Sequence, residues 1–386
     1  MFPRKADINI AEGHTYISGA FTHPMPIAAA QAYRQWIDQR STIGRPLNAS
    51  WPDIEHPATE ASAASKAAFA SLINAKPSEI GLIPNTSTGE NLLVDMLGIA
   101  TNDGNVVTDA LHFEGALVHL IELEKRGLDL RIVMPRDGRI DMRDLERVVD
   151  DNTKLVEVSF VSMYNGFQHD LKAVCDLAHA HRALVYADII QGVGAVTLDV
   201  RATGLDFAAT ATYKWLMGDF GLGFFFIRED LLDRFTRPHW SYDSASDTEI
   251  HLSPFDPLSP TAVTYTPGAD ASSLVQLGTT ASAVAAALSV SIPYIQELGV
   301  ENIQRHRQPL IDRLQVELPR LGFIPQTPIE STSPIVTFAH NDAERLRKKL
   351  SAARINVRVA DYWMRVAPSI YNDMADVERL LEVLSS

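Results

Sequence analysis

The fold is decided by the stretch Thr210-Ala-Thr-Tyr-Lys-Trp-Leu-Met-Gly-Asp-Phe-Gly-Leu-Gly-Phe-Phe-Phe-Ile227. An apolar segment leads to Lys214, a glycine-rich turn follows, and a second apolar segment completes the stretch. Upstream, the apolar run that begins at Ala183 ends at Asp188, and Gln191 comes just after it. A lysine between hydrophobic segments is partly desolvated, which lowers the pKa of its amine and makes it a nucleophile. The stretch therefore predicts a buried, reactive lysine near an acid.

This layout is typical of a lysine that binds pyridoxal phosphate (PLP) as a Schiff base. Asp188 can keep the pyridine nitrogen protonated, so that the ring withdraws electrons from a carbanion on the substrate. Each residue alone admits a simpler interpretation. A lysine at a strand end is usually a solvated charge, and an aspartate there is often a helix N-cap. The other motifs of the chain favour the cofactor.

This pair belongs to a set of five separated motifs, namely Asn85-Thr-Ser-Thr-Gly-Glu-Asn91, Asp109-Ala-Leu-His112, Asp188-Ile-Ile-Gln191, Tyr213-Lys-Trp-Leu216 and Arg365-Val-Ala-Pro-Ser-Ile-Tyr-Asn372. In kind and order they resemble the class V aminotransferase family, which includes cysteine desulfurases, selenocysteine lyases, kynureninases and isopenicillin N epimerase-like proteins. The resemblance covers about Pro84 to Phe226 and Leu277 to Leu384. It implies the PLP-dependent transferase fold (fold type I) and PLP as cofactor.

The resemblance also implies roles for residues on the first half of the chain. Thr86 and Ser87, which open a helix after the strand-like Ile80–Ile83, would bind the cofactor phosphate at a positive helix end. His112 would stack on the pyridine ring, with Phe113 as the competing candidate if the register differs by one residue. A simple helix cap and a buried structural histidine are the alternatives.

Further roles follow for the residues around the lysine. Gln191 would donate to the phenolic oxygen of the cofactor, and Tyr213 stands where many relatives carry histidine. Ala211 replaces a phosphate-binding serine, so that this contact is lost or moves to Thr210 or Thr212. Lys214 and Asp188, together with His112, are the predicted catalytic residues.

Two residues of the second half complete the predicted site. Thr279, in a Gly-Thr pair, would supply a phosphate contact to the partner subunit, which implies a homodimer with a shared active site. Arg365 would hold the α-carboxylate of an amino-acid substrate, because a guanidinium fork matches a carboxylate with two parallel hydrogen bonds.

The chain departs from the family pattern at two places. Met163 occupies the position where many relatives carry an asparagine that touches the ring, and Asn165 substitutes for it only if the loop is reshaped. The loop Asn356–Met364 lacks the cysteine on which cysteine desulfurases form a persulfide. The single cysteine, Cys175, lies in a helical pattern and is expected to be a packed hydrophobe without a disulfide or metal partner. Sulfur transfer through an enzyme persulfide is thus disfavoured.

Composition bounds the partners of the protein. A length of 386 residues with 46% hydrophobic residues suits two cores. A formal net charge of −14 disfavours nucleic acid as a partner, since phosphates are bound by basic surfaces. Neither a signal peptide nor an apolar run of membrane-spanning length is visible, so that a cytoplasmic location without membrane contact is expected.

Alternation of apolar runs with helical patterns predicts an α/β fold with a mostly parallel, doubly wound sheet that binds ligands at the carboxyl ends of its strands. We expect an N-terminal segment (1–25) that packs on the small domain, a large PLP-binding domain (26–270), and a linking helix with a smaller α+β C-terminal domain (271–386). Residues 237–273 are rich in Pro, Ser, Asp and Thr and are predicted to form a long irregular loop.

The sequence predicts an enzyme that acts on an amino acid or amine, with an aminotransferase as the first choice. A selenocysteine lyase or C–S β-lyase is the second choice and an amino-acid epimerase the third. A PLP-binding regulator without activity is the alternative of another class, although the presence of Lys214, Asp188 and Arg365 argues for catalysis.

Overall fold

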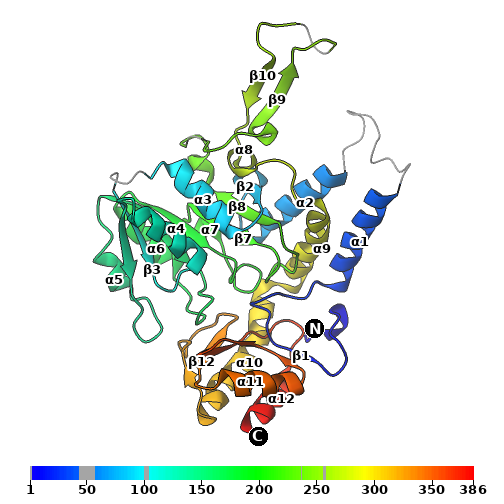
Figure 1. The fold of residues 1–386 in the computed structure, drawn as a ribbon, viewed down its shortest axis with the longest axis vertical. Helices are drawn as coiled ribbons and strands as arrows, with labels where there is room; N and C mark the ends of the chain where they lie inside the picture. The colour runs from blue at the N-terminus through cyan, green and yellow to red at the C-terminus, as the bar shows by residue number, and fades with distance from the viewer. Residues whose placement is uncertain (1, 43–56, 100–103, 236, 255–257) are drawn as a thin grey trace.

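The structure, a computed structural model, describes residues 2–42, 57–99, 104–235, 237–254 and 258–386 (Figure 1). Its centre is a seven-stranded sheet in which β8 runs antiparallel to both of its neighbours, β2 and β7, and the other adjacent strands are parallel. The strands, in spatial order, are β2 (Ile80–Ile83), β8 (Gly223–Ile227), β7 (Phe207–Ala211), β6 (Leu184–Asp188), β5 (Thr153–Ser159), β3 (Asn105–Asp109) and β4 (Asp129–Val133). The predicted α/β fold with a mostly parallel sheet is confirmed.

Helices cover both faces of this sheet, because its strands are apolar on both sides. Alternate residues of β8 show the division: Phe224 and Phe226 belong to one buried cluster, whereas Phe225 and Ile227 belong to the other. The first cluster includes side chains from α2 (Pro57–Leu72), α6 (Leu171–Ala180) and α9 (Ser282–Leu298). The second includes side chains from α3 (Thr86–Leu97), α4 (Glu114–Glu124) and α8 (Ala271–Val275). Continuous hydrophobic runs are therefore what these strands require.

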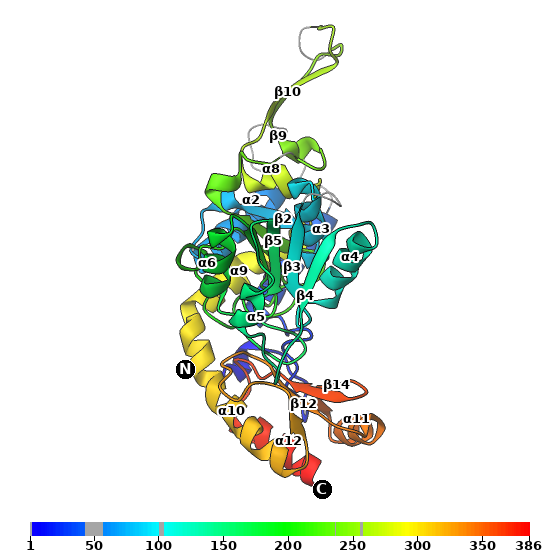
Figure 2. The same ribbon diagram turned by 90° about the vertical axis from the view of Figure 1, so that its left-hand side faces the viewer.

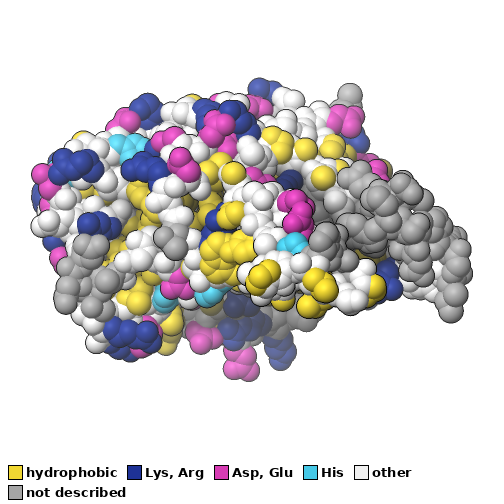
Figure 3. Space-filling model, turned by 90° about the horizontal axis from the view of Figure 1, so that it is seen from above, with side chains coloured by type: hydrophobic (Ala, Val, Ile, Leu, Met, Phe, Trp, Pro, Cys, Tyr) yellow, Lys and Arg dark blue, Asp and Glu magenta, His cyan; other side chains and the backbone are white. Residues whose placement is uncertain are grey.

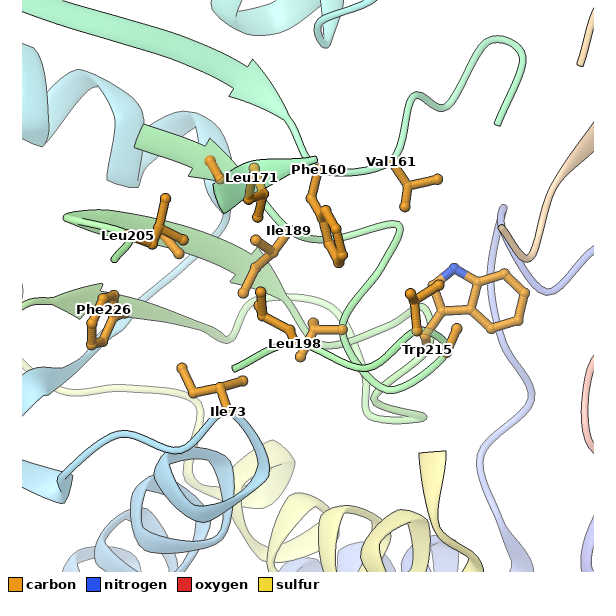
Figure 4. Packing of buried hydrophobic residues seen from close by; sticks show 14 of the residues in the cluster. Ile73, Phe160, Val161, Leu171, Ile189, Leu198, Leu205, Trp215 and Phe226 are labelled. Carbon is orange, nitrogen blue, oxygen red and sulfur yellow. The ribbon is translucent and has the colours of Figure 1, made fainter. Parts of the chain in front are cut away.

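The packing of the first cluster is dense. Phe69 of α2 stacks on Phe224 with ring centroids 4.3 Å apart, and Figure 4 shows Ile73, Leu205 and Phe226 among the buried members of the same cluster. Replacement of one such buried phenylalanine by alanine typically costs about 3–5 kcal/mol of stability. The sheet is thus a rigid support for the side chains at its strand ends.

A smaller unit lies at the C-terminal end of the chain, at the bottom of Figure 1. Its antiparallel sheet packs against three helices around a separate buried cluster. The strands, in spatial order, are β11 (Ile324–Pro325), β12 (Val336–Ala339), β15 (Trp363–Val366) and β14 (Arg358–Val359). The helices are α10 (Val300–Arg320), α11 (Ala343–Ala352) and α12 (Met374–Ser385).

The N-terminal segment joins the two units. Strand β1 (Thr15–Tyr16) pairs in parallel with β13 (Ile355–Asn356). The backbone N–H of His23 donates to the carbonyl of Tyr213 (2.9 Å), and its ring lies 2.7 Å from the hydroxyl of Ser369. Helix α1 (Ile27–Ser41) follows and packs beside α9. The boundaries of the three predicted domains stay a proposal.

Residues 237–273 form a hairpin with a helix rather than the predicted irregular loop. Strands β9 (Ala245–Ile250) and β10 (Val263–Pro267) pair antiparallel, and α8 follows them. Figure 2 shows this arm standing away from the body of the molecule. The prediction was wrong because polar and β-branched residues alternate here without a buried run, and such a strand pair has a weak sequence signal. Residues 255–257 of the segment lie outside the described residues.

In the described ranges no single helix is long and apolar enough to cross a bilayer; α9 and α10 reach that length and composition only as a pair, which is bent by 71° at the junction.

Candidate active site

A cavity lies beyond the carboxyl ends of β5, β6 and β7, where parallel strands bring their last side chains together. Ser159 ends β5, Asp188 ends β6, and Lys214 comes shortly after β7. The cavity is lined by Thr86, Phe113, Ser159, Val161, Met163, Asp188, Ile190, Gln191, Tyr213 and Lys214. Larger hollows exist elsewhere on the described surface, but this one combines a buried lysine, a buried carboxylate and a helix N-terminus.

Lys214 is held in a tight turn and is nearly buried. The turn is closed by the N–H of Gly218, which donates to the carbonyl of Thr212 (2.8 Å). Burial lowers the pKa of the Lys214 amine to about 8; the nearby Asp188 opposes this shift and Arg365 adds to it. About a tenth of an amine with this pKa is unprotonated at pH 7, far more than for an ordinary lysine, and this fraction can act as a nucleophile or a base.

Asp188 lines the same cavity as the lysine. One carboxylate oxygen accepts from the backbone N–H of Ile190 (2.9 Å). Burial raises the pKa of Asp188, while the hydrogen bonds from Ile190 and from the Thr86 hydroxyl act in the opposite direction. No salt bridge joins Asp188 to a cation among the described residues, so that a buried carboxylate is left with an incompletely compensated charge. A protonated pyridine nitrogen would compensate it.

The N-terminus of α3 supplies the phosphate end of the cavity. Asn85 caps the helix by accepting from the N–H of Thr88 (2.9 Å), and Thr86 and Ser87 occupy the first turn. A Cβ atom on Gly115 would lie 2.5 Å from the Phe113 ring and 3.2 Å from the Ser87 hydroxyl. Only glycine at this position lets the ring and the hydroxyl come together there. These residues fit a phosphate at a positive helix end.

Phe113, and not His112, lines the cavity. The imidazole of His112 is fully buried behind the wall, where Nδ1 lies 2.9 Å from the Ser159 hydroxyl and Nε2 lies 3.3 Å from Glu157. We therefore correct the assignment of His112 as the stacking residue: the chain leaves β3 with a turn at Asp109 that directs His112 into the sheet and the next side chain into the cavity. Phe113 becomes the proposed stacking residue.

The polar neighbours of the lysine have partners within the protein. The amide of Gln191 donates to the carbonyl of Ala20 and accepts from the Trp215 indole, both at 3.1 Å. Tyr213 stacks on Phe220 with ring centroids 4.4 Å apart. Both residues lie on the cavity wall, and their roles toward the cofactor stay predictions.

The two candidates for the lost serine contact are engaged elsewhere. The Thr210 hydroxyl donates to the carbonyl of Ala211, and the Thr212 hydroxyl lies within hydrogen-bond distance of the carbonyls of Asp219 and Leu222. Neither threonine lines the cavity. A transfer of the phosphate contact to them is therefore not supported by the geometry.

Arg365 reaches the same region from the small sheet. It is nearly buried on β15, its guanidinium donates to the carbonyl of Met163 (2.8 Å), and its Cζ lies 5.9 Å from the Trp363 ring centroid. Burial lowers the pKa of Arg365 to about 10, which leaves the guanidinium charged at neutral pH. A buried guanidinium with one backbone acceptor is suited to a carboxylate ligand.

Two further predicted residues lie away from the cavity. Asn165 donates to the carbonyls of Gly138 and Gln326 and accepts from the N–H of Phe167, so that it holds the loop after β5 and does not replace the missing asparagine. Thr279 is exposed and shares a hydrogen bond of 2.9 Å with the Tyr242 hydroxyl. Its predicted contact is with a partner subunit and stays a prediction.

Sequence reasoning missed one residue pair beside the site. The Tyr164 hydroxyl donates to Glu114 (2.7 Å), and the charge of Glu114 acts on both Lys214 and Arg365. Each residue directly follows a cavity-lining residue in the sequence. Their neighbours carried motif signals, whereas these two match no motif.

This combination of fold and site defines a PLP-dependent enzyme of fold type I. The family model described as aminotransferase class-V matches residues 20–380, and the chain belongs to this family.

Cysteine desulfurases are among the proteins that this chain resembles. A probable cysteine desulfurase of Methanothermobacter thermautotrophicus is 28% identical over 315 residues, which cover 80% of this chain and 74% of the relative. The apo structure of a cysteine desulfurase from Thermococcus onnurineus NA1 superposes with a TM-score of 0.86 at 23% identity, over 100% of this chain and 98% of the other. A cystine C–S lyase in complex with cysteine persulfide has a TM-score of 0.82 at 18% identity. The match covers 100% of this chain and 99% of the lyase. These likenesses confirm the fold.

Proposed function

We propose that the protein is a PLP-dependent aminotransferase that acts on an α-amino acid. One observation carries the proposal: among the described residues, Lys214 is the single amine on the cavity wall, with its pKa near 8, and Arg365 faces the same region. Transamination moves one proton between the two carbons that are bonded to the substrate nitrogen, so that it needs one group that can both accept and donate.

When bound, PLP supplies an electron-withdrawing ring that stabilises negative charge on the substrate. Thr86 and Ser87 would hold its phosphate, Asp188 its ring nitrogen, Gln191 its phenolic oxygen and Phe113 one ring face. Lys214 would bind its aldehyde carbon and be set free by the amine of the substrate.

Arg365 orients the substrate. The guanidinium fixes the α-carboxylate with two hydrogen bonds, which directs the Cα–H bond toward the freed Lys214. The unprotonated amine would then remove the Cα proton and return it to the carbon on the other side of the substrate nitrogen. Burial raises the pKa of Tyr213 above its ordinary value of 10, so that this neighbour stays protonated and does not compete as the base.

A C–S β-lyase is the second candidate, because the similar proteins include cysteine desulfurases and a cystine C–S lyase. In this chain, cleavage would have to proceed without an enzyme persulfide. Cys175 is fully buried in α6, and burial raises the pKa of its thiol to about 12.

One experiment separates the two reactions. The purified holoenzyme is mixed with single amino acids in the absence of a keto-acid acceptor. An aminotransferase converts the absorption of the cofactor to that of pyridoxamine phosphate and stops after one equivalent of keto acid. A lyase releases pyruvate and ammonia continuously from a Cβ-substituted amino acid, and that result would overturn the first choice.

We also propose a homodimer that shares its active sites. A two-stranded hairpin is marginally stable alone, and exposed apolar side chains gather at the hairpin end: Trp240, Tyr242, Leu258, Tyr265 and Leu277 are each about half exposed or more. Figure 3, which looks onto this end, shows hydrophobic side chains among the charged ones. Thr279 lies at the base of the same region, next to Tyr242.

The dimer is tested by subunit complementation. If Thr279 serves the partner, an inactive Lys214→Ala chain and a weakened Thr279→Ala chain, mixed and refolded together, should recover part of the wild-type activity. Each mixed dimer then contains one intact site. Absence of recovery, with a dimer confirmed by sedimentation, contradicts the shared site.

A further inference from the structure

A buried hydrogen-bonded chain leads from the cavity wall into the sheet. Ser159 lines the cavity, its hydroxyl lies 2.9 Å from Nδ1 of His112, and Nε2 of the same ring lies 3.3 Å from Oε1 of Glu157. All three side chains are buried, with exposed fractions of 6%, 0% and 0% in that order. The reaction proposed above uses neither His112 nor Glu157.

The geometry of the sheet brings these three hydrogen-bonded side chains together. Glu157 and Ser159 are two residues apart on β5, so that their side chains leave the same face of the strand. His112 follows β3, the next strand, and the turn before it is fixed by Asp109, whose carbonyl accepts from the N–H of His112 (3.1 Å). On the other side of β5, Ser159 is in register with Asp188 of β6. The chain therefore ends beside the acid of the cofactor site.

The neutral His112 ring has two possible tautomers, with the proton on Nδ1 or on Nε2. Burial lowers the pKa of His112, so that the ring is neutral at physiological pH. A neutral imidazole has one N–H donor and one acceptor nitrogen. If Glu157 donates a hydrogen bond to Nε2, Nδ1 carries the proton and donates to Ser159. If Glu157 accepts from Nε2–H, Nδ1 is an acceptor for the Ser159 hydroxyl.

Glu157 favours its protonated form. Burial raises the pKa of Glu157 to about 8, and its Oε2 atom is buried without a hydrogen-bond partner in the described part of the chain. Ionisation would leave a charge on that unpartnered oxygen, which is costly. The titratable groups around Glu157 and His112 are Glu90 of α3, His119 of α4, Asp109 of β3, and Tyr186 and Asp188 of β6.

We propose that Glu157 and His112 are positioning residues that determine whether the Ser159 hydroxyl donates a hydrogen bond toward the cofactor site. With Glu157 protonated, its O–H donates to Nε2, Nδ1–H donates to Ser159, and the Ser159 O–H is free to donate toward Asp188 and the cavity. When Glu157 loses its proton to solvent, it accepts from Nε2–H, and Nδ1 accepts from Ser159. The hydroxyl then offers only an oxygen lone pair to the cavity.

The consequence concerns the charge of Asp188. A hydroxyl that donates to a carboxylate stabilises its ionised form, and loss of that donor raises the pKa of the acid. Ser159 thus supports the negative charge that holds a ring nitrogen, and does so below the pKa of Glu157. This inference rests on PLP binding in the cavity and not on the choice between transamination and elimination.

The test is the tautomer of His112 in the PLP-bound full chain. Imidazole ¹⁵N labelling with NMR reports which nitrogen carries the proton, and a His112→Asn variant identifies the resonance. From about pH 6 to pH 10, across the Glu157 pKa near 8, the wild type should change from Nδ1–H to Nε2–H. A single tautomer over the whole range, of either kind, or a doubly protonated ring at neutral pH, overturns the proposal.

Variants assign the change to Glu157. Glu157→Gln cannot ionise and should give one pH-independent tautomer. The matched control is Glu90→Gln, which removes a buried carboxylate that pairs with His119 rather than with His112, and which should keep the transition. Persistence of the transition in Glu157→Gln contradicts the assignment. If that variant does not fold, the tautomer of the wild type still decides.

The effect of the Ser159 hydroxyl on the cofactor site can be measured separately. The absorption spectrum of bound PLP should contain a pH-dependent component with the same midpoint as the His112 tautomer change. Ser159→Ala should abolish that component while the change at His112 remains. A Ser159→Ala spectrum that titrates like the wild type shows that the chain does not reach the cofactor site, and contradicts its role.

Discussion

The two walls of the cavity use burial in opposite ways. On the cationic wall, burial lowers the pKa of Lys214 to about 8 and that of Arg365 to about 10. On the acidic side, burial raises the pKa of Asp188, which lines the cavity, and raises the pKa of Glu157, which lies behind the wall, to about 8. Both walls are thus moved toward neutrality by the same desolvation. The difference is in chemistry: the first wall gains a reactive amine, and behind the second wall Glu157 gains a pKa that keeps its proton near neutral pH.

The largest effect is expected on the cationic wall. Lys214→Ala removes the covalent partner of the cofactor and the base, and a lost general base alone costs about 10²–10⁴ in rate. Borohydride reduction of the wild-type holoenzyme should fix PLP on Lys214. Peptide mass mapping would identify the labelled residue. Lys66→Ala, the loss of another largely buried lysine that bonds Ser272, should leave labelling unchanged. A label found elsewhere would remove the centre of the proposed mechanism.

The acidic wall should respond next. Asp188→Asn keeps a hydrogen-bonding side chain but loses the charge, so that turnover should fall by about 10²–10³, as for other lost electrostatic contacts, while cofactor occupancy falls far less. Absorbance gives the occupancy and steady-state kinetics the turnover. The matched control is Asp170→Asn, at the N-cap of α6. Unchanged turnover in Asp188→Asn contradicts the role of the charge.

Arg365 provides a smaller and more selective effect. Arg365→Lys keeps the charge but loses the planar fork, so that KM for carboxylated substrates should rise by the equivalent of about 1.5–3 kcal/mol. An amine without the carboxylate should be nearly indifferent to the change. Paired kinetics on the two substrates measures the difference. Equal losses on both would show that Arg365 does not bind the carboxylate.

The pH dependence of cofactor capture tests the cationic wall without any substrate. The folded pKa of Lys214 is lowered to about 8, so the reactive unprotonated amine accumulates as pH rises and makes up half of the population at about pH 8. The rate at which apo protein binds PLP covalently should therefore rise about tenfold per unit below that pH and level off above it. A rate that still climbs toward pH 10 would mean an ordinary, exposed lysine.

The smallest expected effect is at the thiol. Cys175→Ser should leave activity intact, because the side chain is packed in α6 and does not line the cavity. Thermal melting checks the fold of the variant. A folded but inactive Cys175→Ser protein would reopen sulfur transfer through an enzyme persulfide.

The buried and exposed strands differ in how much the sequence reveals. The bounds of β7 and β8 could be read directly, because Phe207–Ala211 and Gly223–Ile227 are continuous apolar runs that have no other place than the inside of a sheet. The hairpin of β9 and β10 was missed, since its side chains are largely exposed and leave no buried pattern.

The same limit applies to the site. Lys214, Asp188 and Arg365 were found because motif positions and strand ends place them together. The direction of His112 depends on the turn after Asp109, and one residue of register exchanges it with Phe113. The hydrogen-bonded chain from Ser159 through His112 to Glu157 depends on contacts between neighbouring strands, which single motifs do not encode.

Lys214 also sits between two strands that are neighbours in one sheet. The chain leaves β7, makes the turn that holds the lysine, and returns at once as β8, with the Thr212 hydroxyl tied to the carbonyls of Asp219 and Leu222. Such a double anchor leaves the amine little freedom to travel. Arg365, in contrast, belongs to a separate small sheet and crosses to the large one through the Met163 carbonyl. If the site closes around a substrate, we expect the movement on the arginine side, because the backbone that carries the lysine is fixed by both strands.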